Sequence, residues 1–338
     1  MGFSPGGTTA WVRALPWSEA QGSTGSTLYD VIILGAGPAG LTAAIYAARA
    51  RLKTLVVTGP MVGGQIALTY QVDNYPGFPN GITGPQLVNL MREQAEGFGA
   101  EFLEGEATAV DFTEKPLKVS VGGTEYEGHS VIIATGSVNR KIGLESEERL
   151  MGRGVFVCAT CDAVLYEGKR VVVVGGGDSA VQEALDLAKF AREVFIVHRR
   201  DSLSACMCLK RRADENEKIR FIWNTAVLDI LGEERVEGVR LRNAATGEEW
   251  TMECDGVLIA IGWDPNTSLF RGKVELDERG YIITDGGVGT SVEGVYVCGD
   301  LNDLRYRQVV TACGSGCMAA LEAEMYIDGL GKNRKPGS

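Results

Sequence analysis

The chain has 338 residues, of which 45% are hydrophobic and 23% charged, a balance typical of a globular enzyme rather than a disordered chain. Its 33 basic and 44 acidic residues leave a formal net charge of −11, which repels a polyphosphate backbone and excludes nucleic acid from the expected partners. At roughly 100–200 residues per domain, the length predicts two domains, or three at most.

The N-terminal segment and the cysteine content bear on location. Residues 1–28 are rich in Gly, Ser and Thr and lack the apolar stretch of a signal peptide, so they predict a flexible N-terminal extension. Eight cysteines in a chain of this length do not suggest a secreted disulfide scaffold, which favours a cytoplasmic protein. The longest uncharged run, residues 31–48, contains a glycine-rich turn, so we expect no membrane span.

The first predicted unit is a strand, a tight turn, a helix and a second strand. A buried strand at 30–34 leads into Gly35-Ala-Gly-Pro-Ala-Gly40, followed by a helix over 41–50 and a strand over 52–57. In this setting GxGxxG predicts a dinucleotide site, because its glycines let backbone amides approach a pyrophosphate at a helix N-terminus. Thr58-Gly59 follows the second strand, where NAD dehydrogenases often place an acidic residue, so a plain NAD dehydrogenase is disfavoured.

Two thiols lie three residues apart in Cys158-Ala-Thr-Cys161, with Asp162 directly after them. This spacing suits a disulfide closed within one turn, and the carboxylate could transfer protons. Half of a zinc site and an inert thiol pair are the alternatives, but Cys206-Met-Cys208 has no nearby histidine, so we expect no metal. The other cysteines have apolar or small neighbours and are predicted to be core residues: Cys254, Cys298 (on a strand), Cys313 and Cys317.

A second copy of the strand–turn–helix–strand pattern follows. A strand at 170–174 leads into Gly175-Gly-Gly-Asp-Ser-Ala180, a helix over 181–190 and a strand over 193–197. His198-Arg-Arg200 comes where an adenosine ribose would end, and two guanidiniums there match a 2′-phosphate. A solvated basic corner is the alternative interpretation.

The remaining segments complete the two domains. Strands are predicted at 220–223, 238–242 and 256–261, and turn residues gather near 262–267. A segment over 295–300 and a helical run over 306–327 lack a phosphate loop of their own, so they are expected to return to the first domain. The predicted fold is therefore α/β, with two Rossmann-like three-layer domains and the second inserted into the first.

Several motifs in this order resemble the low-molecular-weight thioredoxin reductases, a class of pyridine nucleotide-disulfide oxidoreductases, over about residues 29–330. Besides the two glycine turns, the cysteine motif and His198-Arg-Arg200, they are Gly63-Gly-Gln65, Ala134-Thr-Gly136, Gly299-Asp300 and Tyr306-Arg-Gln308. The resemblance implies an FAD-binding domain at 29–140 and 266–330, an NADPH-type domain carrying the CxxC motif at 141–265, and a homodimer.

The resemblance also implies roles for individual residues. Cys161 would face the flavin, Cys158 would attack the partner protein, and Asp162 would donate and accept protons. Electrons would pass from NADPH through FAD and the Cys158–Cys161 disulfide to thioredoxin, with a domain rotation alternating the two exchanges. The implied FAD contacts are Gly35, Gly37, Gly40, Gln65, Asn74, Asp300, Arg307 and Gln308. The implied contacts to NADPH, or to a second flavin, are Gly175, Gly177, Asp178, Ser179, Ala180, His198, Arg199, Arg200 and Trp263.

Some positions depart from the family pattern and leave the electron donor open. Ser204 stands where the family usually has a third arginine after His-Arg-Arg, and Trp263 stands where it has a histidine. Ala163 replaces a glycine, and residues 66–69 have lost most of a threonine run. One alternative is therefore an NADPH-independent relative, either a diflavin-linked disulfide oxidoreductase with a second FAD in the nucleotide site or a ferredoxin-linked enzyme. A non-enzymatic redox sensor is disfavoured, because a sensor does not need two dinucleotide folds.

Overall fold

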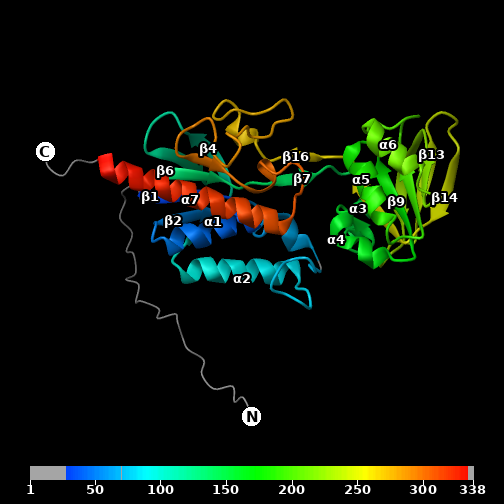
Figure 1. The fold of residues 1–338 in the computed structure, drawn as a ribbon, viewed down its shortest axis with the longest axis horizontal. Helices are drawn as coiled ribbons and strands as arrows, with labels where there is room; N and C mark the ends of the chain where they lie inside the picture. The colour runs from blue at the N-terminus through cyan, green and yellow to red at the C-terminus, as the bar shows by residue number, and fades with distance from the viewer. Residues whose placement is uncertain (1–27, 70, 334–338) are drawn as a thin grey trace, which may run out of the picture.

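A computed structural model describes residues 28–69 and 71–333 of the chain. The predicted N-terminal extension lies outside the described residues up to residue 27. Figure 1 shows two α/β domains side by side, with the long helix α7 (Val309–Asn333) in the first.

The first domain is built on one mixed sheet. Within the described residues it has seven strands in the order β3-β2-β1-β6-β5-β4, with β17 beside β6. Strand β6 changes partner along its length, because residues 124–128 pair antiparallel with β5 whereas residues 131–133 pair in parallel with β17. The chain thus returns to its first sheet after building the second domain, as predicted. The strands are β1 Leu28–Leu34, β2 Thr54–Val57, β3 Glu101–Leu103, β4 Ala107–Asp111, β5 Leu117–Val121, β6 Thr124–Ile133 and β17 Val295–Val297.

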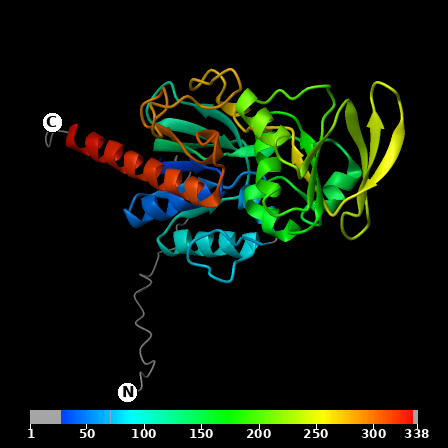
Figure 2. The same ribbon diagram turned by 45° about the vertical axis from the view of Figure 1, so that its right-hand side comes forward.

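Helices cover one face of this sheet. The helices α1 (Pro38–Arg49), α2 (Gly84–Gly97) and α7 lie on the same side in both views (Figures 1 and 2). α1 and α7 meet through small buried side chains, mostly alanine, which lets the two helices approach closely. The opposite face is covered by a separate apolar cluster that includes Phe270, at the end of the 3-10 helix η3 (Ser268–Phe270).

The second domain has a fully parallel sheet in the order β11-β10-β9-β15-β8. Its central valine run is buried on both faces, as expected for a parallel sheet between two layers. One layer is helical and the other is a three-stranded antiparallel sheet, β12-β13-β14. The elements are α3 Glu145–Leu150, β8 Val155–Phe156, α4 Ala159–Asp162, η2 Ala163–Tyr166, β9 Arg170–Gly175, α5 Asp178–Leu187, β10 Glu193–Val197, α6 Met207–Asp214, β11 Ile219–Ile222, β12 Thr225–Leu231, β13 Gly238–Asn243, β14 Glu249–Glu253 and β15 Gly256–Ala260. The prediction of two three-layer Rossmann-like domains is confirmed.

Two chain segments connect the domains. They pair as a short antiparallel ribbon, β7 (Ser137–Asn139) with β16 (Trp263–Pro265), which lies between the domains in Figure 1. The Arg140 guanidinium donates to Asp264 at 2.7 and 2.9 Å beside this ribbon.

Element boundaries differ from the prediction where backbone geometry intervenes. α1 and α5 each begin three residues earlier than predicted, directly after Gly37 and Gly177, so both helix N-termini belong to the glycine turns. Strand β2 begins late because Arg51 takes a left-handed conformation with φ of 65°. Arg307 does the same with φ of 47°, which keeps residues 306–308 out of α7.

Candidate active site

A disulfide joins Cys158 and Cys161, whose Cα atoms are 5.4 Å apart. Cys158 is the N-cap of the one-turn helix α4, and its Sγ accepts a hydrogen bond from the Cys161 backbone N–H at 3.2 Å. The three-residue spacing brings both sulfur atoms onto the same turn, so the predicted disulfide is confirmed.

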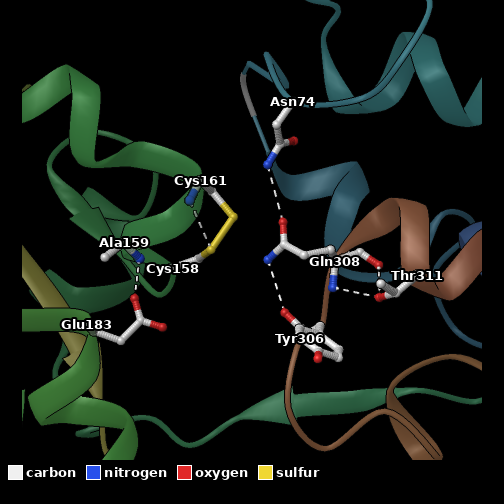
Figure 3. The surroundings of a disulfide bond; sticks show 8 residues. All are labelled: Asn74, Cys158, Ala159, Cys161, Glu183, Tyr306, Gln308 and Thr311. Atoms are coloured by element: carbon white, nitrogen blue, oxygen red, sulfur yellow. Dashed lines mark hydrogen bonds between the residues drawn. A yellow bond between two sulfur atoms is a disulfide. The ribbon is translucent and has the colours of Figure 1, made fainter. Parts of the chain in front are cut away.

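Two carboxyl groups lie beside this turn. Burial raises the pKa of Asp162 to about 6, which suits proton exchange near neutral pH. Glu183, on α5, accepts a hydrogen bond from the Ala159 backbone N–H (Figure 3), and burial raises its pKa to about 7. Glu183 was not predicted from the sequence, because nothing in chain order relates it to a motif 22 residues earlier. The available signal was an acidic residue among the apolar positions Val181, Ala184 and Leu185 of the predicted helix, all three of which are buried.

The disulfide lies on the side of α4 that faces the first domain (Figure 3). Asn74 and Gln308, predicted from the resemblance to contact FAD, come from distant parts of that domain. Their side chains are joined by a hydrogen bond from Asn74 Nδ2 to Gln308 Oε1 at 3.2 Å. Gln308 Nε2 also donates to the Tyr306 carbonyl at 3.1 Å. The fold therefore places predicted cofactor residues opposite the predicted redox pair.

The first glycine turn forms a cradle for a phosphate group. Gly35 has φ of 114°, and a Cβ on Gly40 would lie 1.9 Å from the Gly35 carbonyl oxygen. Gly37 caps α1 without a side-chain acceptor, so the helix offers its first amides to a ligand. Gln65 lies in the neighbouring 3-10 helix η1 (Gly64–Leu68), where it is exposed.

Asp300 and Arg307 complete the predicted flavin contacts. Asp300 lies in the 3-10 helix η4 (Gly299–Leu301), and burial raises its pKa to about 6. Arg307 donates from Nη2 to the Tyr281 hydroxyl at 3.0 Å, and its guanidinium lies 5.4 Å from the centre of the Trp263 ring. Its buried Nε has no hydrogen-bond partner. An orphaned buried donor and an uncapped helix N-terminus fit a large polar cofactor such as FAD.

The second glycine turn is arranged differently. Gly177 caps α5 without a side-chain acceptor, but Asp178 follows it, and Asp178 Oδ1 accepts a hydrogen bond from the Cys206 N–H at 2.7 Å. Ser204, where the family has an arginine, donates from Oγ to the Gly176 carbonyl at 3.2 Å. Ser179 is the second residue of α5, and Ala180 is buried beneath the turn.

In the motif His198-Arg-Arg200 the histidine is buried and the two arginines are exposed. His198 is 9% exposed and packs under the turn, so a Cβ on Gly176 would meet its ring at 2.4 Å. Burial, and then the charges of Arg200 and Arg199, lower its pKa. Both arginines are exposed at the end of β10. The arginines are therefore available to a ligand, whereas His198 supports the turn from below.

The remaining cysteines behave largely as predicted. Burial raises the pKa of the Cys254 and Cys298 thiols to about 12, and Cys313 is also buried. Cys298 lies just after β17 rather than on the strand, because the chain bends there into η4. Cys317 is partly buried, and the exposed cysteines are Cys206 and Cys208. Among residues 28–69 and 71–333, no cluster of three or more His, Cys, Asp or Glu side chains could hold a metal ion.

Two glycine turns that each open a helix, with a disulfide between them in the sequence, define a class of redox protein. The family model for pyridine nucleotide-disulphide oxidoreductases matches residues 29–316, and the chain belongs to this family. Within it, the chain is a member of the thioredoxin reductases. It is 50% identical over 307 residues to a thioredoxin reductase of Mycolicibacterium smegmatis, covering 90% of this chain and 98% of that protein.

Solved structures agree with this assignment. The match to the crystal structure of thioredoxin reductase from Streptococcus pyogenes covers 90% of this chain and 100% of that protein, with 38% identity and a TM-score of 0.86. Lactococcus lactis thioredoxin reductase in its "FR conformation" is 39% identical to this chain, and the match covers 89% of this chain and 99% of that protein. Its TM-score is nevertheless only 0.62. At similar identity and coverage, the lower score points to a different arrangement of the domains.

Proposed function

We propose that this chain is an FAD-dependent thioredoxin reductase that passes electrons from NADPH through FAD and the Cys158–Cys161 disulfide to thioredoxin. The observation that carries the proposal is the disulfide on α4, which faces Asn74 and Gln308 of the first domain (Figure 3). The family uses FAD and NADPH.

The first domain, residues 29–140 and 266–330, would hold FAD. Its pyrophosphate fits the Gly35–Gly40 turn, and Arg307 offers an unpartnered donor. Gln65, Asn74, Asp300 and Gln308 supply the other polar contacts. Bound FAD supplies two-electron redox chemistry between a hydride donor and a disulfide.

The cysteine pair carries out the exchange with the protein substrate. Two-electron reduction breaks the Sγ–Sγ bond and leaves two thiolates, which take up protons according to their pKa values. Cys158 attacks the partner's disulfide and forms a mixed disulfide, and Cys161 then displaces the partner's thiol and restores the Cys158–Cys161 bond. Asp162, with a pKa of about 6, gives and takes the proton beside them.

The second domain, residues 141–265, would bind NADPH. The Gly175–Ala180 turn offers the amides of α5, and Arg199 and Arg200 would bind the 2′-phosphate. Trp263, in the connecting ribbon, has its ring 5.4 Å from the Arg307 guanidinium of the first domain, and its contact with the nucleotide stays a prediction. The Lactococcus comparison supports a domain rotation that alternates nucleotide and thioredoxin access.

A homodimer and a cytoplasmic location complete the proposal. Exposed apolar side chains follow one another at helical spacing on α7, at Met318, Leu321 and Met325, and could pack against a second copy. No helix in the described part of the chain is long and apolar enough to cross a membrane. The thiol content suits a reducing compartment.

The decisive experiment counts flavin per chain in the purified protein and follows its absorbance under anaerobic conditions as NADPH is added. One flavin, rapid bleaching and NADPH-dependent thioredoxin reduction are expected. Two flavins without bleaching would instead identify a diflavin-linked disulfide oxidoreductase. One flavin that is reduced by ferredoxin and not by NADPH would identify a ferredoxin-linked enzyme.

A further inference from the structure

The redox helix α4 depends on its neighbours for its position. It has four residues, and one helical turn contributes too little hydrogen bonding to be stable alone. Ala159, its first residue, is fully buried, and its backbone N–H donates to Glu183 Oε2 on α5 (Figure 3). Glu183 therefore satisfies one of the free amides of α4 at the residue directly after Cys158.

Two acidic side chains and one basic side chain act in opposite directions on the pKa of Glu183. Burial is the main reason that its pKa is raised to about 7, and the hydrogen bond from Ala159 works against that shift. Asp186 on its own helix and Asp162 on α4 raise the pKa further, whereas Arg307 of the first domain lowers it. The carboxyl group therefore changes its charge close to neutral pH, next to the disulfide.

We propose that Glu183 is a positioning residue of the redox centre: its carboxyl group holds α4 through the Ala159 amide, and its charge decides how readily the Cys158 and Cys161 thiolates form. This inference rests on the proposed role of the cysteine pair. Reduction creates two negative sulfur atoms where Asp162 and Glu183 already bring carboxylates. An ionised Glu183 disfavours the thiolates and raises the thiol pKa values, whereas a protonated Glu183 does not. Proton uptake at Glu183 is thereby linked to opening of the disulfide.

Two substitutions separate the charge of Glu183 from its hydrogen bond. Glu183→Gln keeps an oxygen that can accept from Ala159 but removes the charge. Glu183→Leu removes both while retaining much of the volume. Glu148→Gln is the matched control, because it makes the same charge change at an exposed position on α3, where the carboxylate pairs with Lys141 rather than with α4.

The primary measurement is the alkylation rate of Cys158 and Cys161 from pH 5.5 to 9. The full-length, flavin-loaded protein is reduced with dithiothreitol, desalted under anaerobic conditions and treated with iodoacetamide, and each site is quantified by peptide mass spectrometry. We expect Glu183→Gln to raise the rate at pH 7.5 by about three- to tenfold, because the apparent thiol pKa falls by roughly 0.5–1 unit. Glu148→Gln should follow the unmodified protein. Overlapping profiles for Glu183→Gln and the unmodified protein would overturn the proposal.

A second measurement tests the positioning role. Glu183→Leu should lower kcat for disulfide reduction by about tenfold while leaving the KM for NADPH unchanged, and Glu183→Gln should retain most of that kcat. Equal kcat values for the Leu variant and the unmodified protein would contradict positioning. If Glu183→Leu fails to fold, the pH profile of Glu183→Gln decides the matter.

The same samples distinguish this proposal from the proposed function. Dithiothreitol reduces the pair whether or not NADPH does, so the alkylation profile remains interpretable in either case. Failure of NADPH to reduce Cys158–Cys161 in the unmodified protein would overturn the proposed function and leave the test of Glu183 intact.

Discussion

The two glycine turns of this chain share a backbone design and differ in what covers them. At the first turn, α7 packs directly on α1, so closely that a Cβ on Gly316 would lie 2.1 Å from the Ala39 carbonyl oxygen. At the second turn, Ser204 and Cys206 hydrogen-bond to Gly176 and Asp178, but Asp178 and Ser179 of the turn, and Arg199 and Arg200 after β10, stay exposed. The contrast suggests that an enclosed turn keeps its ligand as a resident cofactor, whereas an open one exchanges its ligand during turnover.

The largest expected effect involves neither turn. Replacing Cys158 or Cys161 by Ser should lower thioredoxin reduction by on the order of 10³-fold or more, because no disulfide can form or exchange. Flavin content and NADPH-driven bleaching should be retained, since both turns are intact. Steady-state assays and absorbance spectra measure the two properties separately, and loss of flavin in these variants would contradict the separation.

A matched pair of alanine substitutions tests the comparison itself. Gly37 and Gly177 have φ of −76° and −88°, and an added Cβ would meet only ordinary contacts, at 3.9 Å from the Gly63 carbonyl oxygen and 3.8 Å from Ser204 Oγ. Both variants should fold, but each methyl group would block the approach of a phosphate.

Gly37→Ala should therefore weaken FAD binding by about ten- to hundredfold, and Gly177→Ala should raise the KM for NADPH by a similar factor with normal flavin content. Flavin retention on dilution and steady-state kinetics measure the two effects. An effect of either substitution on the other ligand would show that the two turns are not independent.

The next smaller effect concerns the open turn alone. The double variant Arg199→Ala/Arg200→Ala should raise the KM for NADPH by at least about tenfold and leave that for NADH unchanged, because only NADPH carries the 2′-phosphate. Arg192→Ala, at the opposite end of β10 and also exposed, is the control and should change neither constant. Equal changes for both nucleotides would assign the arginines a structural role.

The smallest effect is on stability and concerns the turn that carries the disulfide. The folded-state pKa of Asp162 is about 6, above its ordinary value of 3.8, so folding favours its neutral form. Its contribution to stability is therefore present below about pH 4 and is lost as the pH rises through about 6. Asp162→Asn should stabilise the oxidised protein by about 1 kcal/mol at pH 8, where it replaces a buried charge, and should not stabilise it at pH 4, where the carboxyl group is already neutral. The gain is kept to about 1 kcal/mol because Asp162 retains some contact with solvent. Thermal unfolding at both pH values measures this, with the exposed Glu167→Gln as control. A gain that is equal at both pH values would contradict the assignment.

Much of the candidate site could be predicted because its parts are local in sequence. The glycine turns and the cysteine motif each place their groups within a few residues, so hydrophobic pattern and spacing were sufficient. The different roles of His198 and of the two arginines that follow it could not be predicted in this way. Only the packing of the His198 ring beneath Gly176 shows that the histidine supports the turn while the arginines remain exposed.

The sequence by itself determined the two Rossmann-like domains, the insertion of one into the other, and the disulfide, because each follows from short-range periodicity, turn chemistry or spacing. The tertiary structure decided which groups meet across long separations. It joined Asn74 to Gln308, left the Arg307 Nε buried without a partner, and brought Glu183 to the amide of Ala159. Such contacts depend on how sheets, helices and the connecting ribbon pack in space, and no local pattern in the chain encodes them.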